Sequence, residues 1–213
     1  MKRNILFSLI LLLFCSFAYS QSYEKGDILI DGGIGLGIYG TNVKQTISGV
    51  TNEESDGTAS VLIPIKVQYG ISKKFSVGIL VQPENYIVDN DSASIKKEDA
   101  KGSSFRVIGT YYIINNDKFN LNAEIGFGSA TFKQEVEENG NTSEAEWRGG
   151  NFALGLGLKY YFSKHIGFFA NTSYSNYSFD IDKWTFNNVT IDADGWEAKF
   201  SGAEVTVGLA LKF

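Results

Sequence analysis

The residues best suited to chemistry are few, and their spacing argues against a catalytic centre. The chain of 213 residues contains one His, His165, and one Cys. A His-based hydrolase needs its imidazole beside a Ser, Asp or Asn partner. His165 instead follows Ser163-Lys164, a short polar segment typical of a tight turn. No paired carboxylate motif stands out, so we expect no catalytic residue, no cofactor and no enzymatic activity.

Acidic residues offer a second candidate chemistry, the binding of divalent cations. Asp180 and Asp182 precede Asp192, Asp194 and Gly195, and the latter three form a fragment of a calcium-binding loop. The distal Glu that such a loop needs is missing at the required spacing. A transition-metal site also lacks ligands, since His and Cys occur once each. We therefore expect no metal site and interpret these acids as a solvated loop.

The first 20 residues have the pattern of a secretory signal peptide. A basic head, Met1 to Asn4, precedes an apolar run at 5–18 that is too short to span a bilayer. Ala18-Tyr19-Ser20 then places small residues before a cleavage site at Gln21. We predict a signal peptide at 1–20 and one domain at 21–213. Cleavage removes the only Cys, which excludes disulfides and Cys-ligated metals.

Composition excludes two broad classes of protein. Nineteen basic residues stand against 24 acidic ones, for a net charge of −5, and loss of Lys2 and Arg3 makes it −7. No basic patch is visible, so we expect no nucleic-acid partner. The 43% apolar content is too high for a disordered chain. No later apolar run is long enough for a transmembrane helix.

Period-two alternation is the main structural signal in the mature chain. Val205, Val207, Leu209, Leu211 and Phe213 share one face of the last segment, and small or polar residues share the other. The same pattern recurs along the chain and predicts an all-β fold. We expect eight strands near 27–39, 57–70, 75–86, 103–115, 118–132, 146–162, 165–179 and 197–213.

The connections between these strands alternate in length. Three are tight, near 72–74, 115–117 and 163–164, and four are long and polar, at 40–56, 87–102, 133–145 and 180–196. This indicates an antiparallel up-and-down meander, which is expected to close because closure removes the exposed edges. Two closed forms fit: a soluble lipocalin-like barrel with its apolar face inside, and a membrane barrel with that face outside.

Two features favour the membrane barrel. The polar face is rich in Gly, such as Gly33, Gly126 and Gly155, and an eight-stranded interior has little room for side chains. The apolar face carries aromatic residues near both ends, where a bilayer has its two interfaces. The membrane-interface aromatics that we predict are Tyr69, Phe75, Phe105, Phe119, Phe127, Phe152, Tyr160, Phe162, Phe168 and Tyr174.

The signal peptide, the Gly-rich segment Asp31 to Gly37 and the alternating C-terminal strand carry a family resemblance. The chain resembles the small outer-membrane β-barrel proteins of Gram-negative bacteria, the OmpA-barrel and OmpX-like proteins. The resemblance implies an eight-stranded antiparallel up-and-down transmembrane β-barrel in the cell outer membrane, a monomer in contact with outer-membrane lipid and lipopolysaccharide. It also implies that Leu209, Leu211 and Phe213 form a signal read by the barrel-assembly machinery.

The inward face of such a barrel carries charges of both signs. Arg106 and Glu124 lie on consecutive strands and both face inward. Because a lone buried charge is costly, we predict an internal network of ion pairs and hydrogen bonds that plugs the barrel. A narrow polar path for small solutes is the alternative. The predicted network comprises Asp31, Lys66, Gln68, Arg106, Asn122, Glu124, Lys159 and Glu204.

The long connections suggest where partners would bind. All four carry acids, for example Glu53-Glu54 and Asp89 to Asp91, which predicts a negative outer rim facing the envelope or an external partner. Divalent cations would then be needed to bridge the rim to lipopolysaccharide. Sideways transport of an apolar molecule stays open as an alternative. Pro64 is the one candidate opening, and we interpret it as a bulge or strand-end irregularity.

Overall fold

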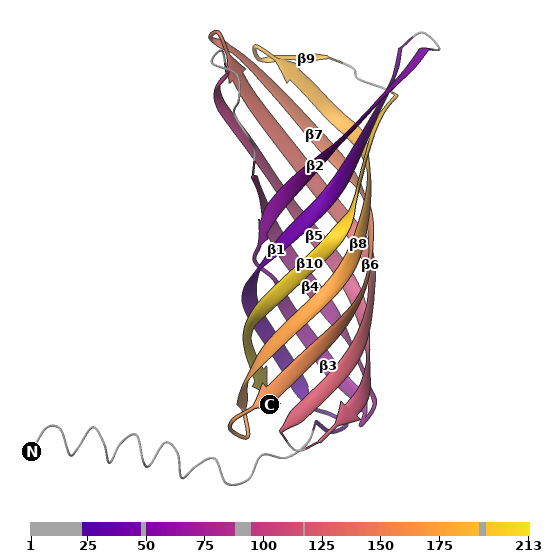
Figure 1. Cartoon of the computed structure of the whole chain (residues 1–213), viewed down its shortest axis with the longest axis vertical. Coiled ribbons are helices and arrows are strands. Elements are labelled where there is room, and N and C mark those ends of the chain that lie inside the picture. Colours follow the sequence, from indigo (N-terminus) through magenta and orange to yellow (C-terminus); the bar gives the residue numbers. More distant parts are fainter. Residues whose placement is uncertain (1–22, 48–49, 88–94, 117, 192–194) are drawn as a thin grey trace, which may run out of the picture.

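The chain folds into a closed ring of antiparallel strands (Figure 1). The structure, a computed structural model, describes residues 23–47, 50–87, 95–116, 118–191 and 195–213. The first strand, β1, pairs with the last, β10, and β10 also pairs with β8, which closes the ring. β3 continues the path of β2, and β9 folds back on β8. The predicted eight-stranded up-and-down barrel is therefore confirmed.

The strands are long and follow one another around the ring. Their bounds are β1 Ile28–Ile47, β2 Val50–Leu62, β3 Ile65–Ser72, β4 Phe75–Ile87, β5 Ile95–Asn115, β6 Phe119–Glu138, β7 Asn141–Tyr161, β8 Ile166–Phe186, β9 Val189–Ile191 and β10 Trp196–Lys212.

The two ends of the barrel differ. The described N-terminal residues and the C-terminus lie at the end with the short turns, as Figure 1 shows. The opposite end flares and carries two tight hairpins. Asn139 and Gly140 have positive φ angles of 51° and 82°, and Asn187 and Asn188 have 47° and 66°. Both central residues of a type I′ hairpin turn need this left-handed conformation, which Asn and Gly tolerate best.

Much of the chain that we expected to be long loops is paired strand, so this expectation was wrong. β6 and β7 remain in register up to Glu138 and Asn141, across nearly all of the predicted loop at 133–145. β1 and β2 pair throughout 40–47 and 50–56. β6, with 20 residues, has about twice the 9–11 that a strand needs to cross a bilayer. The segments 1–20, 88–94 and 192–194, which include the expected signal peptide and part of two loops, lie outside the described residues.

The polar composition of these extensions explains the error. Beyond the bilayer the outer face of a strand meets water, so apolar and polar residues no longer alternate. The polar sequence of Gln134 to Glu138, for example, is typical of a loop. The segment is nevertheless paired along its length with residues 141–145. The wall therefore continues beyond the membrane, and we call this upper part, which includes 40–47, 50–56 and 133–148, the extracellular cylinder.

The outer face of the barrel is apolar over its lower part. Large hydrophobic side chains stand exposed by 37% to 70% on every part of the ring, including Leu36, Leu154, Leu156 and Val207. A belt of this size on a soluble monomer would be unusual, whereas it matches the hydrocarbon of a bilayer. The soluble lipocalin-like alternative needs the opposite arrangement and is wrong. Among the residues that the structure describes, no helix is long and apolar enough to cross a membrane.

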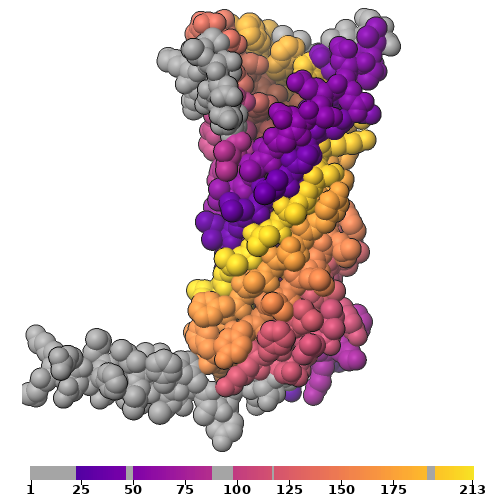
Figure 2. Space-filling view, in the orientation of Figure 1, coloured from indigo at the N-terminus to yellow at the C-terminus, as the bar shows by residue number. Residues whose placement is uncertain are grey.

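The seam between the first and last strands is packed against glycine. β1 and β10 lie side by side as diagonal bands in Figure 2, and Gly33 is paired with Gly208. A Cβ atom on Gly33 would collide with the backbone carbonyl of Val207 and approach the Phe169 ring. Neighbouring Gly32 points outward and has open space around it. The inner face of the seam thus requires a residue without a side chain at position 33.

Pro64 marks an interruption of hydrogen bonding, and no bulge is present. Leu62 pairs with Glu84 and Ile65 with Val81, so the register is unchanged across the proline. The amide of Gly33 donates to the Pro64 carbonyl at 3.1 Å, and Pro64 has no N–H to donate in return. The wall therefore keeps its register here with fewer hydrogen bonds.

Candidate functional site

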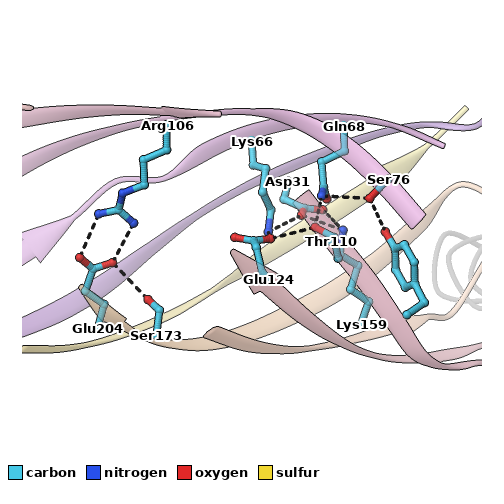
Figure 3. Close-up of polar contacts among 11 residues, drawn as sticks. Asp31, Lys66, Gln68, Ser76, Arg106, Thr110, Glu124, Lys159, Ser173 and Glu204 are labelled. Carbon is cyan, nitrogen blue, oxygen red and sulfur yellow. Dashed lines mark hydrogen bonds and ion pairs between the residues drawn. The ribbon is translucent and has the colours of Figure 1, made fainter. Parts of the chain in front are cut away.

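A cluster of four charged side chains crosses the lower half of the barrel interior (Figure 3). Lys159 donates to both carboxylate oxygens of Asp31, at 2.7 and 2.9 Å. Lys66 lies 2.7 Å from Glu124 and 3.5 Å from Asp31. Two positive and two negative groups are thus paired and formally neutral. The side chains come from β1, β3, β6 and β7, so the cluster ties opposite walls together.

Uncharged polar residues extend this lower cluster. Gln68 donates to Thr110 at 2.6 Å and to Ser76 at 3.2 Å, and Thr110 donates to Glu124 at 3.4 Å. Asn122 is also buried and lies against Gly157, but no hydrogen bond joins it to the charged groups. Buried polar groups gain stability when they are hydrogen-bonded, and most of this layer satisfies that condition.

A second cluster lies above the first and centres on Arg106. The guanidinium reaches the two Glu204 oxygens at 3.2 and 3.4 Å and donates to the Tyr177 hydroxyl at 2.6 Å. Glu84 accepts from Gln82 at 3.1 Å, from Tyr86 at 2.8 Å and from Tyr177 at 2.8 Å. The cluster holds one guanidinium and two carboxylates, so it carries one formal negative charge in excess.

The space between the two clusters is small. A cavity of about 30 Å³ is lined by Pro64, Lys66, Arg106, Glu124 and Glu204, among others. A cavity needs about 10–15 Å³ of accessible space to hold a single water. The cavity can hold water, and the ion pairs above and below it leave no space for a larger solute.

Aromatic residues fill the barrel above the Arg106 cluster. Tyr86, Phe132 and Phe200 pack edge to face, with ring centroids 5.1 to 5.8 Å apart. Tyr177 and Phe179 stack at 5.8 Å. This layer, which we call the aromatic floor, comprises Tyr39, Tyr86, Ala100, Ala130, Phe132, Trp147, Tyr177, Phe179, Ala198 and Phe200.

Tyr23 closes the opposite end of the barrel. Its ring lies 4.3 Å from that of Tyr112 and is buried, and its hydroxyl donates to the carbonyl of Phe75 at 2.9 Å. The backbone of Gly26 and Asp27 exchanges hydrogen bonds with Gly70, which holds the segment across the opening. Residues just before β1 therefore cover the periplasmic mouth.

Replacing Tyr23 with phenylalanine is expected to lower the stability of the barrel by about 1 kcal/mol, because the buried hydroxyl loses one hydrogen bond. Unfolding by urea in lipid vesicles measures this difference. Tyr69→Phe removes a hydroxyl from an exposed outward ring and serves as the control. Equal stability of the two variants would contradict the role of the Tyr23 hydroxyl.

The predicted interface aromatics face outward. The rings of Phe162 and Phe168 contact each other at 5.0 Å, as do those of Phe75 and Tyr111. Phe162 is partly buried, and the others are exposed: Tyr69, Phe75, Phe105, Phe119, Phe127, Phe152, Tyr160, Phe168 and Tyr174.

The C-terminal residues complete the seam. The backbone of Phe213 exchanges two hydrogen bonds of 2.9 Å with Ile28, and its exposed ring lies 6.3 Å from that of His165. Leu209 is exposed on the outer face, and Leu211 is partly buried there. His165 occupies the turn before β8, where its Nδ1 contacts the Lys212 carbonyl at 2.8 Å. Among the described residues, no group of three or more His, Cys, Asp or Glu is placed to hold a metal ion.

The acidic residues of the extracellular cylinder are partly paired. Lys133 lies 2.8 Å from Glu144, and this hydrogen bond raises the pKa of the lysine. Asn42 donates to Glu53 and lowers the pKa of that carboxyl, with a smaller contribution from Lys44. Arg148 lies 3.1 Å from Asp182. These contacts offset part of the negative charge that the sequence suggests for the rim.

Sequence reasoning missed the polar residues that complete the upper cluster. Glu84, Tyr39, Tyr86 and Tyr177 bond to Arg106, to Glu204 or to each other. The alternation of inward and outward residues along β4 could have identified Glu84 and Tyr86. Gln82 faces inward, and these two residues follow it on the same face. The predicted network took inward charged and amide residues and did not consider inward Tyr.

Comparisons with known proteins identify the fold. No protein-family model matches the chain, and no curated protein matches its sequence. The crystal structure of the outer membrane protein OprG of Pseudomonas aeruginosa is similar, with a TM-score of 0.59 and 15% identity over 90% of this chain and 97% of that one. The outer membrane protein AlkL in lipid bilayers gives 0.55 and 12%, over 92% and 94%. The outer membrane protease OmpT of Escherichia coli gives 0.51 and 10%, over 93% and 100%.

Proposed function

We propose that this chain is a non-enzymatic integral membrane protein with a closed lumen. It has the fold of the small Gram-negative outer-membrane β-barrels. Its lower wall is anchored in the outer membrane by the exposed apolar belt. Its upper wall stands outside the membrane and presents hairpins to the envelope or to an external partner. The protein is proposed to act as a monomer, since the ring is closed in its lower wall by the pairing of β1 with β10 and leaves no strand edge there to pair.

The observation that carries this proposal is the filling of the interior. The Asp31–Lys159 and Arg106–Glu204 pairs lie at successive levels and join opposite walls (Figure 3). The aromatic floor lies above them and Tyr23 lies below. A solute would have to break both ion-pair clusters to pass, and isolating a buried charge costs about 3–5 kcal/mol.

The extracellular cylinder supports the second part of the proposal. Its hairpins combine acids such as Glu54 and Glu138 with paired lysines, which is chemistry suited to polar contacts with lipopolysaccharide through divalent cations. The alternating C-terminal strand with Leu209, Leu211 and Phe213 is proposed to be the element that the barrel-assembly machinery recognises.

Single-channel recording in a planar bilayer tests the closed lumen. We expect the refolded chain 21–213 to insert and to remain electrically silent. The shift in gel mobility between unboiled and boiled samples serves as the control for folding and insertion. Discrete conductance steps from folded protein would overturn the proposal and favour a pore, with Arg106, Glu124 and Lys159 as its first candidate residues.

A further inference from the structure

The extracellular mouth of the barrel contains a large cavity above the aromatic floor. Its volume is about 780 Å³, within the range of small-molecule binding sites. Tyr86, Phe132 and Phe200 of the aromatic floor form its base. Ala100, Ala145 and Ala198 also line it, and their small side chains leave the space open. We call this cavity the outer cup.

All three tryptophans of the chain line the outer cup. Trp196 lies between the other two, with its ring centroid 6.4 Å from that of Trp147 and 5.6 Å from that of Trp184. They come from β10, β7 and β8, so the row is held by three adjacent strands of the ring. The Trp184 indole donates to Ser143 at 3.0 Å, which fixes its orientation.

The charges around the outer cup are of one sign. Among the described residues that line it, Asp56 and Glu98 are the only ones with an acidic or basic side chain. Tyr86 in the base donates to Glu84, which belongs to the cluster with one negative charge in excess. An anion in the cup would face carboxylates from the side and from below. A cation would be attracted by both.

We propose that the outer cup binds a small organic cation with an apolar or aromatic body. The faces of Trp, Tyr and Phe rings attract cations, and aromatic cages of this kind recognise quaternary ammonium groups. The apolar body is buried against the alanines and the aromatic floor. The cationic group is placed against the row of indole rings, and Glu98 and Asp56 on the lining supply the opposite charge.

Intrinsic fluorescence measures this binding directly, because no tryptophan lies outside the outer cup. Benzyltrimethylammonium and phenylmethanesulfonate are suitable probes, since both carry a benzyl group and are soluble in water. We expect titration of the folded protein with the cation to give a saturable change in fluorescence. The anion is expected to bind at least about tenfold more weakly. Tenfold corresponds to about 1.4 kcal/mol.

Two variants and one control separate the parts of the proposal. Glu98→Gln is expected to weaken binding of the cation severalfold. The control, Asp99→Asn, makes the same change of charge on the next residue, on the opposite face of β5, and is expected to leave binding unchanged. Ala145→Phe reduces the volume of the cup and is expected to abolish binding. The gel-mobility shift shows whether each variant is folded. If the Ala145 variant does not fold, the Glu98→Gln variant alone tests the proposal.

Equal responses to the cation and the anion, or a linear response to both, would overturn the proposal. Unchanged affinity in both Glu98→Gln and Asp56→Asn would overturn the preference for cations. The result is independent of the conductance of the barrel, since the cup lies outside the ion-pair clusters.

Discussion

Replacing Arg106 with alanine is expected to destabilise the folded barrel by about 3–5 kcal/mol. The variant leaves Glu204 and Glu84 buried together, each exposed by 2%, with no positive group beside them. The Tyr177 hydroxyl also loses its hydrogen bond from the guanidinium. The loss is measured by urea unfolding in vesicles and by the temperature at which the folded band disappears from gels.

Arg148 provides a matched control within the same chain. It pairs with Asp182 on the extracellular cylinder, where its side chain is 66% exposed. Exposed ion pairs contribute about 0–1 kcal/mol, so Arg148→Ala is expected to change stability by no more than that. If the two alanine variants unfolded at the same urea concentration, the Arg106 cluster would not be a structural plug. A wild-type barrel that conducted ions, with a conductance that changed in a stable Arg106→Ala variant, would assign the cluster to a pore instead.

The second large effect is expected at the seam of the ring. Gly33→Val places side-chain atoms against the carbonyl of Val207 and the Phe169 ring, and backbone on the partner strand cannot move aside without breaking the pairing of β1 with β10. We expect this variant to give no folded band on unboiled gels. The comparison is with Gly32→Val, which adds the same side chain one residue away.

Gly32 points outward into open space, and valine is favoured in strands that face lipid. The Gly32 variant is therefore expected to fold and insert like the parent chain. A folded Gly33→Val barrel would show that β1 and β10 can separate or shift, and that the seam tolerates a side chain. Failure of both variants would point to a general requirement for Gly in β1 rather than to the contact with Val207.

The alternation of inward and outward residues along each strand allowed most of the inward-facing residues to be predicted. The alternation in β6 and β7 placed Asn122, Glu124 and Lys159 inward, where the structure also has them. The pairing of these groups could not be predicted, because the tilt of the strands decides which inward residues lie at the same level. Arg106 and Glu124 are on neighbouring strands, yet Arg106 pairs with Glu204 and Glu124 with Lys66.

The upper half of the barrel was harder to predict. Its strands have water on the outer face, so the hydrophobic contrast that reveals a strand is absent from segments such as Lys133 to Glu138. Inward aromatic residues added to the difficulty. Tyr39, Tyr86 and Phe132 resemble lipid-facing residues by type, although the alternation along their strands places them inside.

The pairing of β1 with β10 has a consequence for the order of folding. Leu29 to Gln45 pair with Lys212 to Trp196, so the chain must bring together residues separated by most of its length. Contacts at such sequence separation slow folding, since a long loop must close before they form. A chain that lacks β10 would leave β1 and β8 as two open edges able to pair with other chains. Productive folding therefore has to wait until the last strand, β10, has been made and exported.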